Sequence, residues 1–212
     1  EGFLPEQSDN REVYDFIVNE LEEVMPLLST DGQGSYGRFN QFAAKMTLAK
    51  MYINSEVYIG ESKWEEAISE VQDIIENDPN SQLNYTNYIK SVNEAGPTEG
   101  YRFVRYEIGS GVVATYGTDV PFYRYTDALM IKAECLLRLG RADEAASIVS
   151  EVRQRAFKDS DPSKAVVTGA ELMQGSTYEY GKYEDGEITN YEGGDDIEYG
   201  RFLDELACEF VG

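Results

Sequence analysis

The sequence predicts an all-α fold built from antiparallel helix pairs, with irregular loop excursions between them. Apolar residues recur at helical spacing over most of the chain. Two helical segments that lie far apart in the sequence share one pattern of small and apolar residues. Residues 101–106 alternate weakly, as a short strand would. At 212 residues the chain is long enough for one domain with a substantial core.

The first two helices are expected at residues 12–28 and 39–56. Asp9 and Glu12 have the spacing of a capping box. Apolar residues then repeat at helical spacing, at Val13, Ile17, Leu21, Val24 and Leu28. A turn rich in Gly and Ser precedes the second helix, whose apolar residues would be Phe42, Met46, Ala49 and Ile53.

A third helix is expected after Ser62, which can cap it together with Glu65. It should end before Pro79, because proline cannot continue a helix. Its buried face would hold Trp64, Ala67, Val71, Ile74 and Ile75. From residue 80 to about residue 118 no helical period persists, so this part is expected to be largely irregular.

Helices are expected again from residue 121 onward. Gly140 fits the left-handed position that follows a helix, and a further helix is expected at residues 143–157. Residues 178–200 are acidic and rich in Tyr and Gly, and we expect an exposed loop there. A last amphipathic helix is expected at residues 201–210.

The composition excludes several classes of function. With 40 acidic and 18 basic residues the net charge is −22, which disfavours binding to nucleic acid or to anionic lipid. The absence of histidine rules out a Ser–His–Asp triad and disfavours a typical zinc site, because histidine is the commonest metal ligand. We therefore expect no cofactor and no metal. Cys135 falls on an apolar helical face and is expected to be a buried thiol.

Two segments of the chain repeat each other. KWEEAISEVQDIIENDP and RADEAASIVSEVRQRAF each carry an Ala followed by apolar residues four and seven positions later. Small residues at these positions let two antiparallel helices approach closely, and the pattern resembles the tetratricopeptide repeat. The alternative is an unrelated pair of helices. Such repeats are scaffolds and do not define an activity.

Four segments in order resemble the SusD/RagB family of surface nutrient-binding lipoproteins of Bacteroidota. They are REVYDFIVNELEEVMPLL, then GRFNQFAAKMTLAKMYINSEVYIGESKWEEAISEVQDII, then DVPFYRYTDALMIKAECLLRLG with DEAASIVSEVRQRAF, and finally FLDELACEFVG. The second segment matches the family signature at Leu48, Ala49, Lys50, Tyr52, Asn54, Glu56, Tyr58 and Gly60. The last two match at Pro121, Arg124, Tyr125, Asp127, Leu129, Ala133, Glu134, Val152, Arg153, Arg155, Ala156, Glu205, Leu206, Ala207, Glu209 and Gly212.

This resemblance implies a binding protein that is not an enzyme. Family members sit on the outer face of the outer membrane through a lipid anchor, which would lie outside this sequence. They capture an oligosaccharide, or a peptide in some relatives, and deliver it to a SusC-like TonB-dependent transporter. Relatives are longer, so residues 1–212 are expected to be one partial SusD-like domain. We expect it to lack N-terminal and C-terminal parts and a segment near residues 80–101.

The ligand-binding candidates lie in the irregular region, at Asn84, Tyr85, Asn87, Tyr88 and Tyr101. Aromatic faces can cover the C–H side of a sugar ring, and amides can bind its hydroxyl groups. An ordinary polar loop is the simpler interpretation of these residues.

Other notable residues favour structural roles. Asp127 at the start of a helix and Arg153 with Arg155 at the end of one suit the helix dipole, and Arg124 can bind carboxylates or carbonyls of a neighbouring loop. Trp64 is expected to pack between helices. The acidic run at residues 183–196 offers oxygen ligands for Ca²⁺ without the spacing of an EF-hand. A solvated or partner-facing loop is the preferred interpretation of that run.

Two other functions compete with nutrient capture. A tetratricopeptide-type adaptor would bind protein partners only. A glycosidase would need a pair of carboxylates, and with 40 acidic residues such pairs arise by chance.

Overall fold

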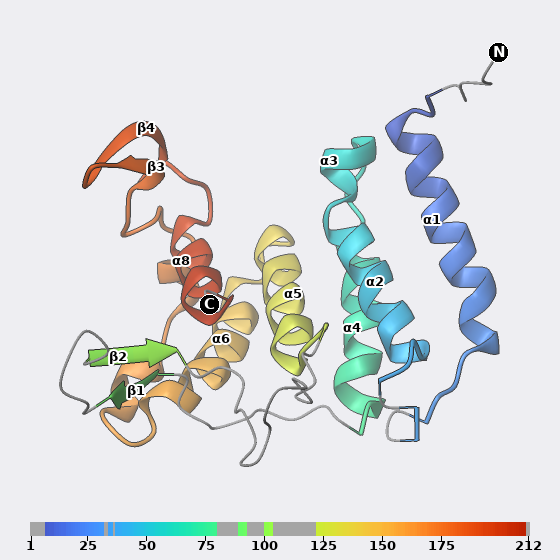
Figure 1. Ribbon diagram of the computed structural model, residues 1–212, viewed down its shortest axis with the longest axis horizontal. Coiled ribbons are helices and arrows are strands. Elements are labelled where there is room, and N and C mark those ends of the chain that lie inside the picture. The colour runs from blue at the N-terminus through green and yellow to red at the C-terminus, as the bar shows by residue number, and fades with distance from the viewer. Residues whose placement is uncertain are drawn as a thin grey trace. The chain divides into compact units, whose positions relative to one another are not determined.

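The computed structural model describes residues 7–31, 34–35, 37–79, 89–92, 100–103 and 122–210. These residues form eight α-helices, two short 3-10 helices and two antiparallel two-stranded sheets (Figure 1). The predicted all-α fold is therefore confirmed. The chain divides into two compact units, residues 1–82 with 125–145 (unit 1) and residues 83–124 with 146–212 (unit 2).

Helix α1 (Asn10–Val24) begins as the sequence predicts. The Asp9 side chain accepts a hydrogen bond from the Glu12 backbone N–H at 2.8 Å, and Glu12 accepts one from the Asp9 backbone N–H in return. Both bonds of the capping box are thus present. The helix continues into the 3-10 helix η1 (Met25–Leu27), which contains Pro26.

The second predicted helix is broken into α2 (Gln41–Ile53) and α3 (Ser55–Ile59). Asn40 caps α2 by accepting a hydrogen bond from the Ala43 N–H at 3.0 Å. The break falls at Asn54, whose backbone is not helical. Gly60 ends α3 in a left-handed conformation at φ 74°.

Helix α4 (Trp64–Asn77) ends at the predicted place but is not capped by Ser62. Lys63 occupies the cap position and makes no side-chain capping bond. Ser62 therefore lies one residue too early for its hydroxyl to serve as the cap. Glu65 and Glu66 place negative charge in the first turn, which stabilises the helix N-terminus in its place.

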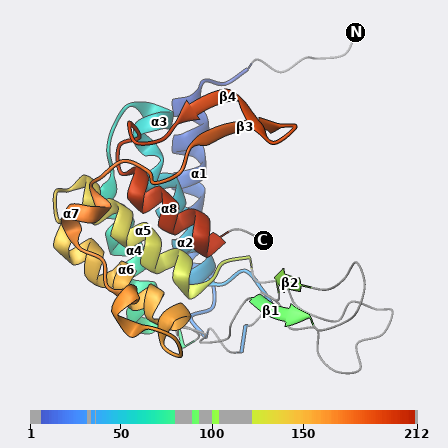
Figure 2. The same cartoon turned by 90° about the vertical axis from the view of Figure 1, so that its left-hand side faces the viewer.

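The helices of unit 1 pack in the order α1, α2, α4 and α5 (Tyr125–Arg138), and α3 packs against α1 (Figures 1 and 2). Ala49 and Ala67 have no exposed surface, which fits the predicted close approach of α2 and α4. One core cluster joins side chains from all four helices of this row: Tyr14, Val18, Leu48, Tyr52, Ala67 and Cys135.

Helix α5 ends in the turn that the sequence predicts at Gly140. Gly140 has φ 75°, and its N–H donates to the Leu137 carbonyl at 2.9 Å. The Arg141 N–H donates to the Leu136 carbonyl at 2.8 Å. These two bonds define a Schellman motif, which satisfies the last carbonyls of α5 before α6 (Ala142–Phe157) begins.

Unit 2 holds the rest of α6, the 3-10 helix η2 (Pro162–Ala165), α7 (Gly169–Leu172) and α8 (Gly200–Phe210). Helix α8 confirms the predicted last helix. The backbone of residues 100–103 forms β2 (Gly100–Phe103), which pairs antiparallel with β1 (Ile89–Val92). The extended segment predicted from residue 101 onward is thus confirmed over residues 101–103.

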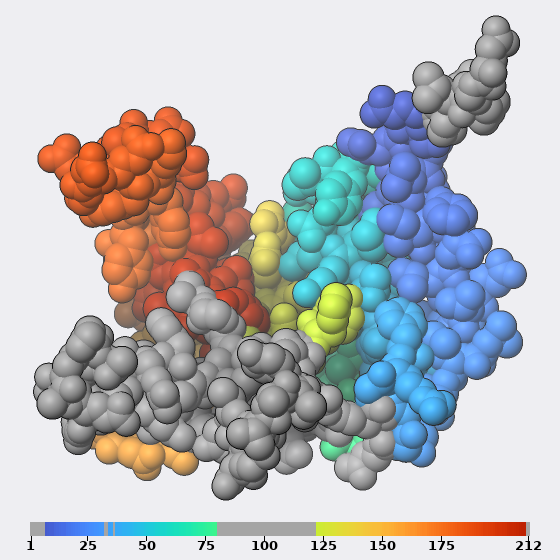
Figure 3. All heavy atoms as spheres, in the orientation of Figure 1, coloured from blue at the N-terminus to red at the C-terminus, as the bar shows by residue number. Residues whose placement is uncertain are grey.

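The predicted loop at residues 178–200 is wrong, because most of it forms a hairpin of β3 (Tyr180–Glu184) and β4 (Glu187–Gly193). Asp185 and Gly186 connect the strands, with φ 52° and 88°. Two positive φ angles are what a two-residue type I′ turn requires, and Asp-Gly is a preferred sequence for it. Figure 3 shows the hairpin projecting from the rest of unit 2.

Candidate functional site

Of the five predicted ligand-binding residues, the structure describes the backbone of Tyr101. Asn84, Tyr85, Asn87 and Tyr88 lie outside the described residues. The backbone of Tyr101 lies in β2, opposite Ser91 of β1. Their role in ligand binding therefore stays a prediction.

The residues that carry the family resemblance meet instead at α8. Glu209 accepts a hydrogen bond from Arg124 Nη1 at 3.1 Å, and its other carboxylate oxygen pairs with Arg155 Nη2. The Arg155 and Glu209 side chains are each 7 % exposed. The Arg124 guanidinium carbon also lies 4.9 Å from the ring centre of Phe210. The residue just before α5 and the last turn of α6 are thus both tied to the C-terminal helix.

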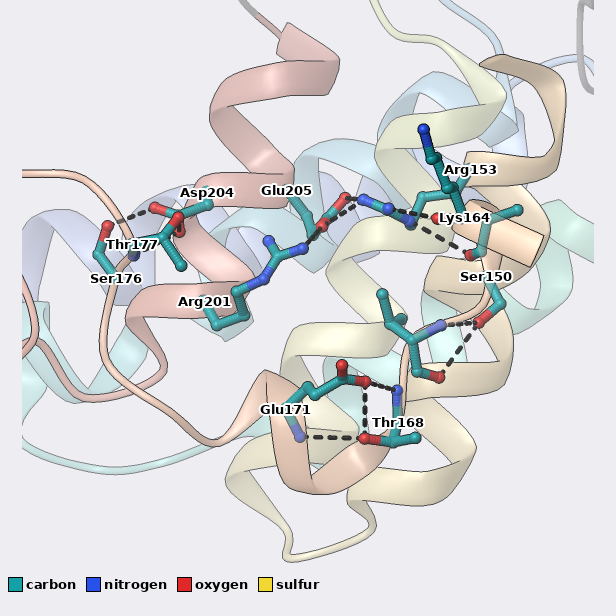
Figure 4. A network of polar contacts seen from close by, with 12 residues as sticks. Ser150, Arg153, Lys164, Thr168, Glu171, Ser176, Thr177, Arg201, Asp204 and Glu205 are labelled. Carbon is teal, nitrogen blue, oxygen red and sulfur yellow. Dashed lines mark hydrogen bonds and ion pairs between the residues drawn. The ribbon is translucent and has the colours of Figure 1, made fainter. Parts of the chain in front are cut away.

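A second arginine–glutamate cluster lies one turn earlier on α8 (Figure 4). Arg153 Nη1 binds both carboxylate oxygens of Glu205, at 2.6 and 2.8 Å, and Arg201 Nη2 binds Glu205 Oε1 at 2.6 Å. Arg153 also donates to the carbonyls of Ala165 and Lys164, at 3.2 and 2.6 Å. The contacts of Arg153 hold α6, η2 and α8 together, and Arg201 binds Glu205 within α8.

Asp204 forms a third anchor on α8, at the base of the hairpin (Figure 4). Its carboxylate is 1 % exposed and accepts hydrogen bonds from Ser176, from the backbone and hydroxyl of Thr177, and from Tyr180 of β3. Burial alone would raise the pKa of Asp204, but the hydrogen bonds outweigh it and lower the pKa below its ordinary 3.8. Asp204 therefore stays ionised and fixes the hairpin to α8.

These three acidic side chains of α8, called the α8 anchors below, are Asp204, Glu205 and Glu209. Their carboxylates are occupied by internal donors, so they are poorly placed to bind a ligand or to transfer a proton. The structural interpretation of Arg124, Arg153 and Arg155 is supported, but the reason differs from the predicted one. Arg153 and Arg155 pair with carboxylates of α8 rather than only complementing the end of α6.

Two further predicted structural residues lie in unit 1. Asp127 Oδ1 of α5 lies 3.9 Å from Lys50 Nζ of α2, so its carboxylate faces a cation of a neighbouring helix. Trp64 is partly buried against the core cluster, with the Arg138 guanidinium carbon 6.0 Å from its ring centre. The packing role predicted for Trp64 is thus consistent with its position.

The cysteines are both free thiols, and Cys135 is fully buried as predicted. Burial raises the pKa of Cys135 to about 12. Cys208 is exposed. A nucleophilic role for Cys135 is disfavoured because the reactive thiolate is scarce at neutral pH.

Unit 1 carries an open polar depression of about 640 Å³ between the start of α1 and α3. Gln7, Ser8, Asn10 and Tyr58 offer it amides, a hydroxyl and an aromatic ring, and Tyr58 is 44 % exposed. Arg11 lies at its edge and binds the Ile59 carbonyl and Glu61. Sequence reasoning missed this position because its residues come from segments far apart in the chain.

Within the part of the chain that the structure describes, no group of His, Cys, Asp or Glu side chains could hold a metal ion. Among the described helices, none is both long and apolar enough to cross a membrane.

Comparison with protein families matches residues 35–180 to the SusD family. The chain belongs to the SusD family. The match begins before α2 and extends through α6 and α7 to the first residue of β3, so it includes both predicted helix pairs. No curated protein sequence matches the chain.

Membership of the SusD family associates this chain with nutrient binding linked to uptake across the outer membrane. SusD proteins are binding proteins. In agreement with this, Arg124, Arg153 and Arg155, which carry the family resemblance, form internal ion pairs. The α8 anchors Asp204, Glu205 and Glu209 lie beyond the matched residues. They nevertheless bind Arg124, Arg153 and Ser176, which lie within the matched range.

Proposed function

We propose that this SusD-family protein captures an oligosaccharide at the bacterial cell surface and delivers it, uncleaved, to a SusC-like TonB-dependent transporter. The observation that carries the proposal is the family match over residues 35–180. A lipid anchor outside this sequence would hold the protein on the outer face of the outer membrane. Residues 1–212 would act as one SusD-like domain that includes both units.

The ligand would bind residues that the internal clusters do not use. Asn84, Tyr85, Asn87, Tyr88 and Tyr101 have suitable chemistry for this role. The depression at Asn10 and Tyr58 offers the same combination of amide and aromatic ring in unit 1. These two positions can be tested separately.

The test is calorimetric titration of the purified chain with defined neutral oligosaccharides, such as linear α-1,4-, β-1,4- and β-1,3-linked glucans. The first variant replaces Asn84, Tyr85, Asn87 and Tyr88 with Ala, and the second carries Asn10→Ala and Tyr58→Ala. Loss of binding in one variant, with the other unchanged, identifies the capture site. Loss of one stacked ring and its hydrogen bonds should weaken binding roughly tenfold or more.

Three results would redirect the proposal. Release of shorter sugars from an intact glycan would indicate a glycosidase. Binding of peptides in place of glycans would change the nutrient but keep the capture role. No affinity for either ligand and no co-purifying transporter would contradict capture altogether.

A protein-only adaptor is the second candidate, and one observation favours it. Helix α1 exposes Val13 and Phe16, which are 46 % and 64 % exposed. Exposed apolar side chains on one helix are typical of surfaces that bind another protein. Phe16→Ala would abolish binding to an adaptor's partner and leave glycan affinity unchanged.

A further inference from the structure

We propose that the β3–β4 hairpin is a docking arm for an extended, basic segment of a partner protein. The proposal concerns an interaction surface and does not depend on which nutrient is captured. It rests on the faces of the hairpin, on its charge and on the way in which it is held.

One face of the hairpin presents aromatic rings to solvent. Tyr183 pairs with Ile188 and Gly181 pairs with Tyr191, so these residues share a face of the two strands. Tyr183 is 67 % exposed and Tyr191 is 53 % exposed. We call Tyr183, Ile188 and Tyr191 the tyrosine face. Gly181 leaves room for Ile188, whose Cγ2 would lie 2.7 Å from a Cβ at that position.

The charge of the hairpin is strongly negative. Residues 179–193 contain five acidic residues and one lysine. Lys182 is paired with Glu184 at 2.6 Å. Within the described residues, no ion pair involves Glu179, Asp185, Glu187 or Glu192. A cation is therefore the complementary partner for this arm.

The tip of the hairpin carries a local conflict that a cation would relieve. Glu184 and Glu187 pair directly across the strands, with Asp185 in the turn between them. Like charges directly opposite each other destabilise a strand pair. The arginines of unit 2 whose side chains are described, Arg124, Arg153, Arg155 and Arg201, all bind carboxylates of α8. Lys182 already offsets part of this repulsion through Glu184, but Asp185 and Glu187 form no ion pair among the described residues, so a further cation would have to come from a partner.

A two-stranded hairpin alone is marginally stable in water. This one is fixed at its base by Asp204, while residues 182–187 are all exposed. An arm that is held at one end and open beyond it can meet an extended partner. Glu184 and Glu187 point to the opposite face from Tyr183 and Ile188, because successive side chains of a strand alternate between faces. A partner strand that adds along an edge of the hairpin also projects its side chains to both faces, so consecutive Lys or Arg residues would place cations over the tyrosine rings and beside the carboxylates.

The first experiment uses the full chain and a small carrier protein that displays eight consecutive lysines in an internal loop. Tyr183→Ala with Tyr191→Ala should weaken binding about tenfold, the size expected when two exposed cation–ring contacts are lost. Phe16→Ala is the matched control, since it removes an exposed ring from α1. It should leave the affinity unchanged.

The second experiment separates docking from folding. Glu184→Gln with Glu187→Gln should weaken binding several-fold and at the same time leave the hairpin as stable or more stable, as followed by amide hydrogen exchange of residues 180–193. Glu20→Gln with Glu23→Gln makes the same change of charge on α1 and should do neither. A purely structural role for the two hairpin carboxylates could not produce this opposite pair of effects.

Several outcomes would overturn the proposal. The first is equal weakening by the α1 and hairpin charge variants, and the second is equal binding of a carrier loop that displays eight consecutive glutamates. Binding of the same eight-residue sequence as a free peptide, but not in the carrier loop, would indicate a nutrient-binding site. Loss of glycan affinity in the tyrosine variant, with carrier binding unchanged, would assign the face to the sugar.

Discussion

Glu209 Oε1 lies 3.1 Å from Arg124 Nη1, and this contact ties the residue just before α5 to the end of α8. The same carboxylate binds Arg155 of α6. Glu209→Ala would leave two arginines near each other without their shared anion. Breaking a buried ion pair in this way costs about 3–5 kcal/mol of unfolding free energy.

Urea denaturation would measure this change, with Glu209→Gln as the milder variant. Gln keeps the hydrogen-bond acceptor but not the charge, so we expect it to fall between the wild type and Ala. Glu144→Ala breaks an exposed pair with Arg141 and should have little effect. Equal effects of Glu144→Ala and Glu209→Ala would contradict the structural role of the anchor.

Asp204 gives the stability of unit 2 a defined response to acid. Its folded-state pKa is below 3.8. Its contribution is therefore fully present above the unfolded value and is lost as the pH falls through the folded value. Asp204→Asn should cost roughly 1–3 kcal/mol at neutral pH, because an acceptor of several hydrogen bonds is lost.

The same variant should flatten the pH dependence of stability below about pH 4. Denaturation curves recorded by tyrosine fluorescence at several pH values would show this weaker pH dependence. A variant with the same acid sensitivity as the wild type would mean that other carboxylates dominate acid unfolding.

Substitutions at two glycines should distinguish the stability cost of backbone strain from that of a steric clash. Gly140 has φ 75° with nothing within 4 Å of a Cβ, so Gly140→Ala should cost only about 1–2 kcal/mol of strain. A Cβ on Gly200 would lie 2.1 Å from the Ser176 backbone nitrogen. Gly200→Ala should therefore cost more, because α8 must move away from the backbone at residues 175–176.

Thermal unfolding of the two variants provides the comparison. An equal loss of stability in the two variants would show that the backbone around Ser176 shifts at little cost to accommodate the added Cβ.

The two thiols should differ in reactivity. In the native protein only Cys208 should react with a thiol reagent near pH 8, because Cys135 is buried and its pKa is about 12. Burial also raises the pKa of Cys208, so its reaction should be slower than that of a free thiol. In denaturant both should react. Fast labelling of native Cys135 would indicate that the core around α5 opens readily.

Much of the fold could be predicted from periodicity and capping. The box at Asp9 and Glu12, the stop before Pro79 and the turn at Gly140 are local signals, and all three were confirmed. The hairpin at Asp185 and Gly186 was missed even though the dipeptide is a strong turn signal. Its flanking residues are acidic and exposed rather than alternately apolar, so the usual strand pattern was absent.

The contacts of α8 could not be predicted for a different reason. Phe202 shows the helical period, but Glu205 and Glu209 are buried polar residues that would be expected on the outside of a helix. Only their partners explain the burial, and Arg153 and Arg155 come from a segment more than forty positions earlier. No local pattern links such pairs.

The way in which Asp204 is held bears on ionic strength. It binds hydroxyl and backbone N–H donors rather than a cation, so its contacts have no ionic partner for dissolved salt to screen. The pairs of Glu205 and Glu209 are sheltered from water, whereas Arg11–Glu61 and Lys182–Glu184 are open to it. In brackish or saline surroundings the outer pairs would weaken while the internal cross-links of unit 2 keep their strength.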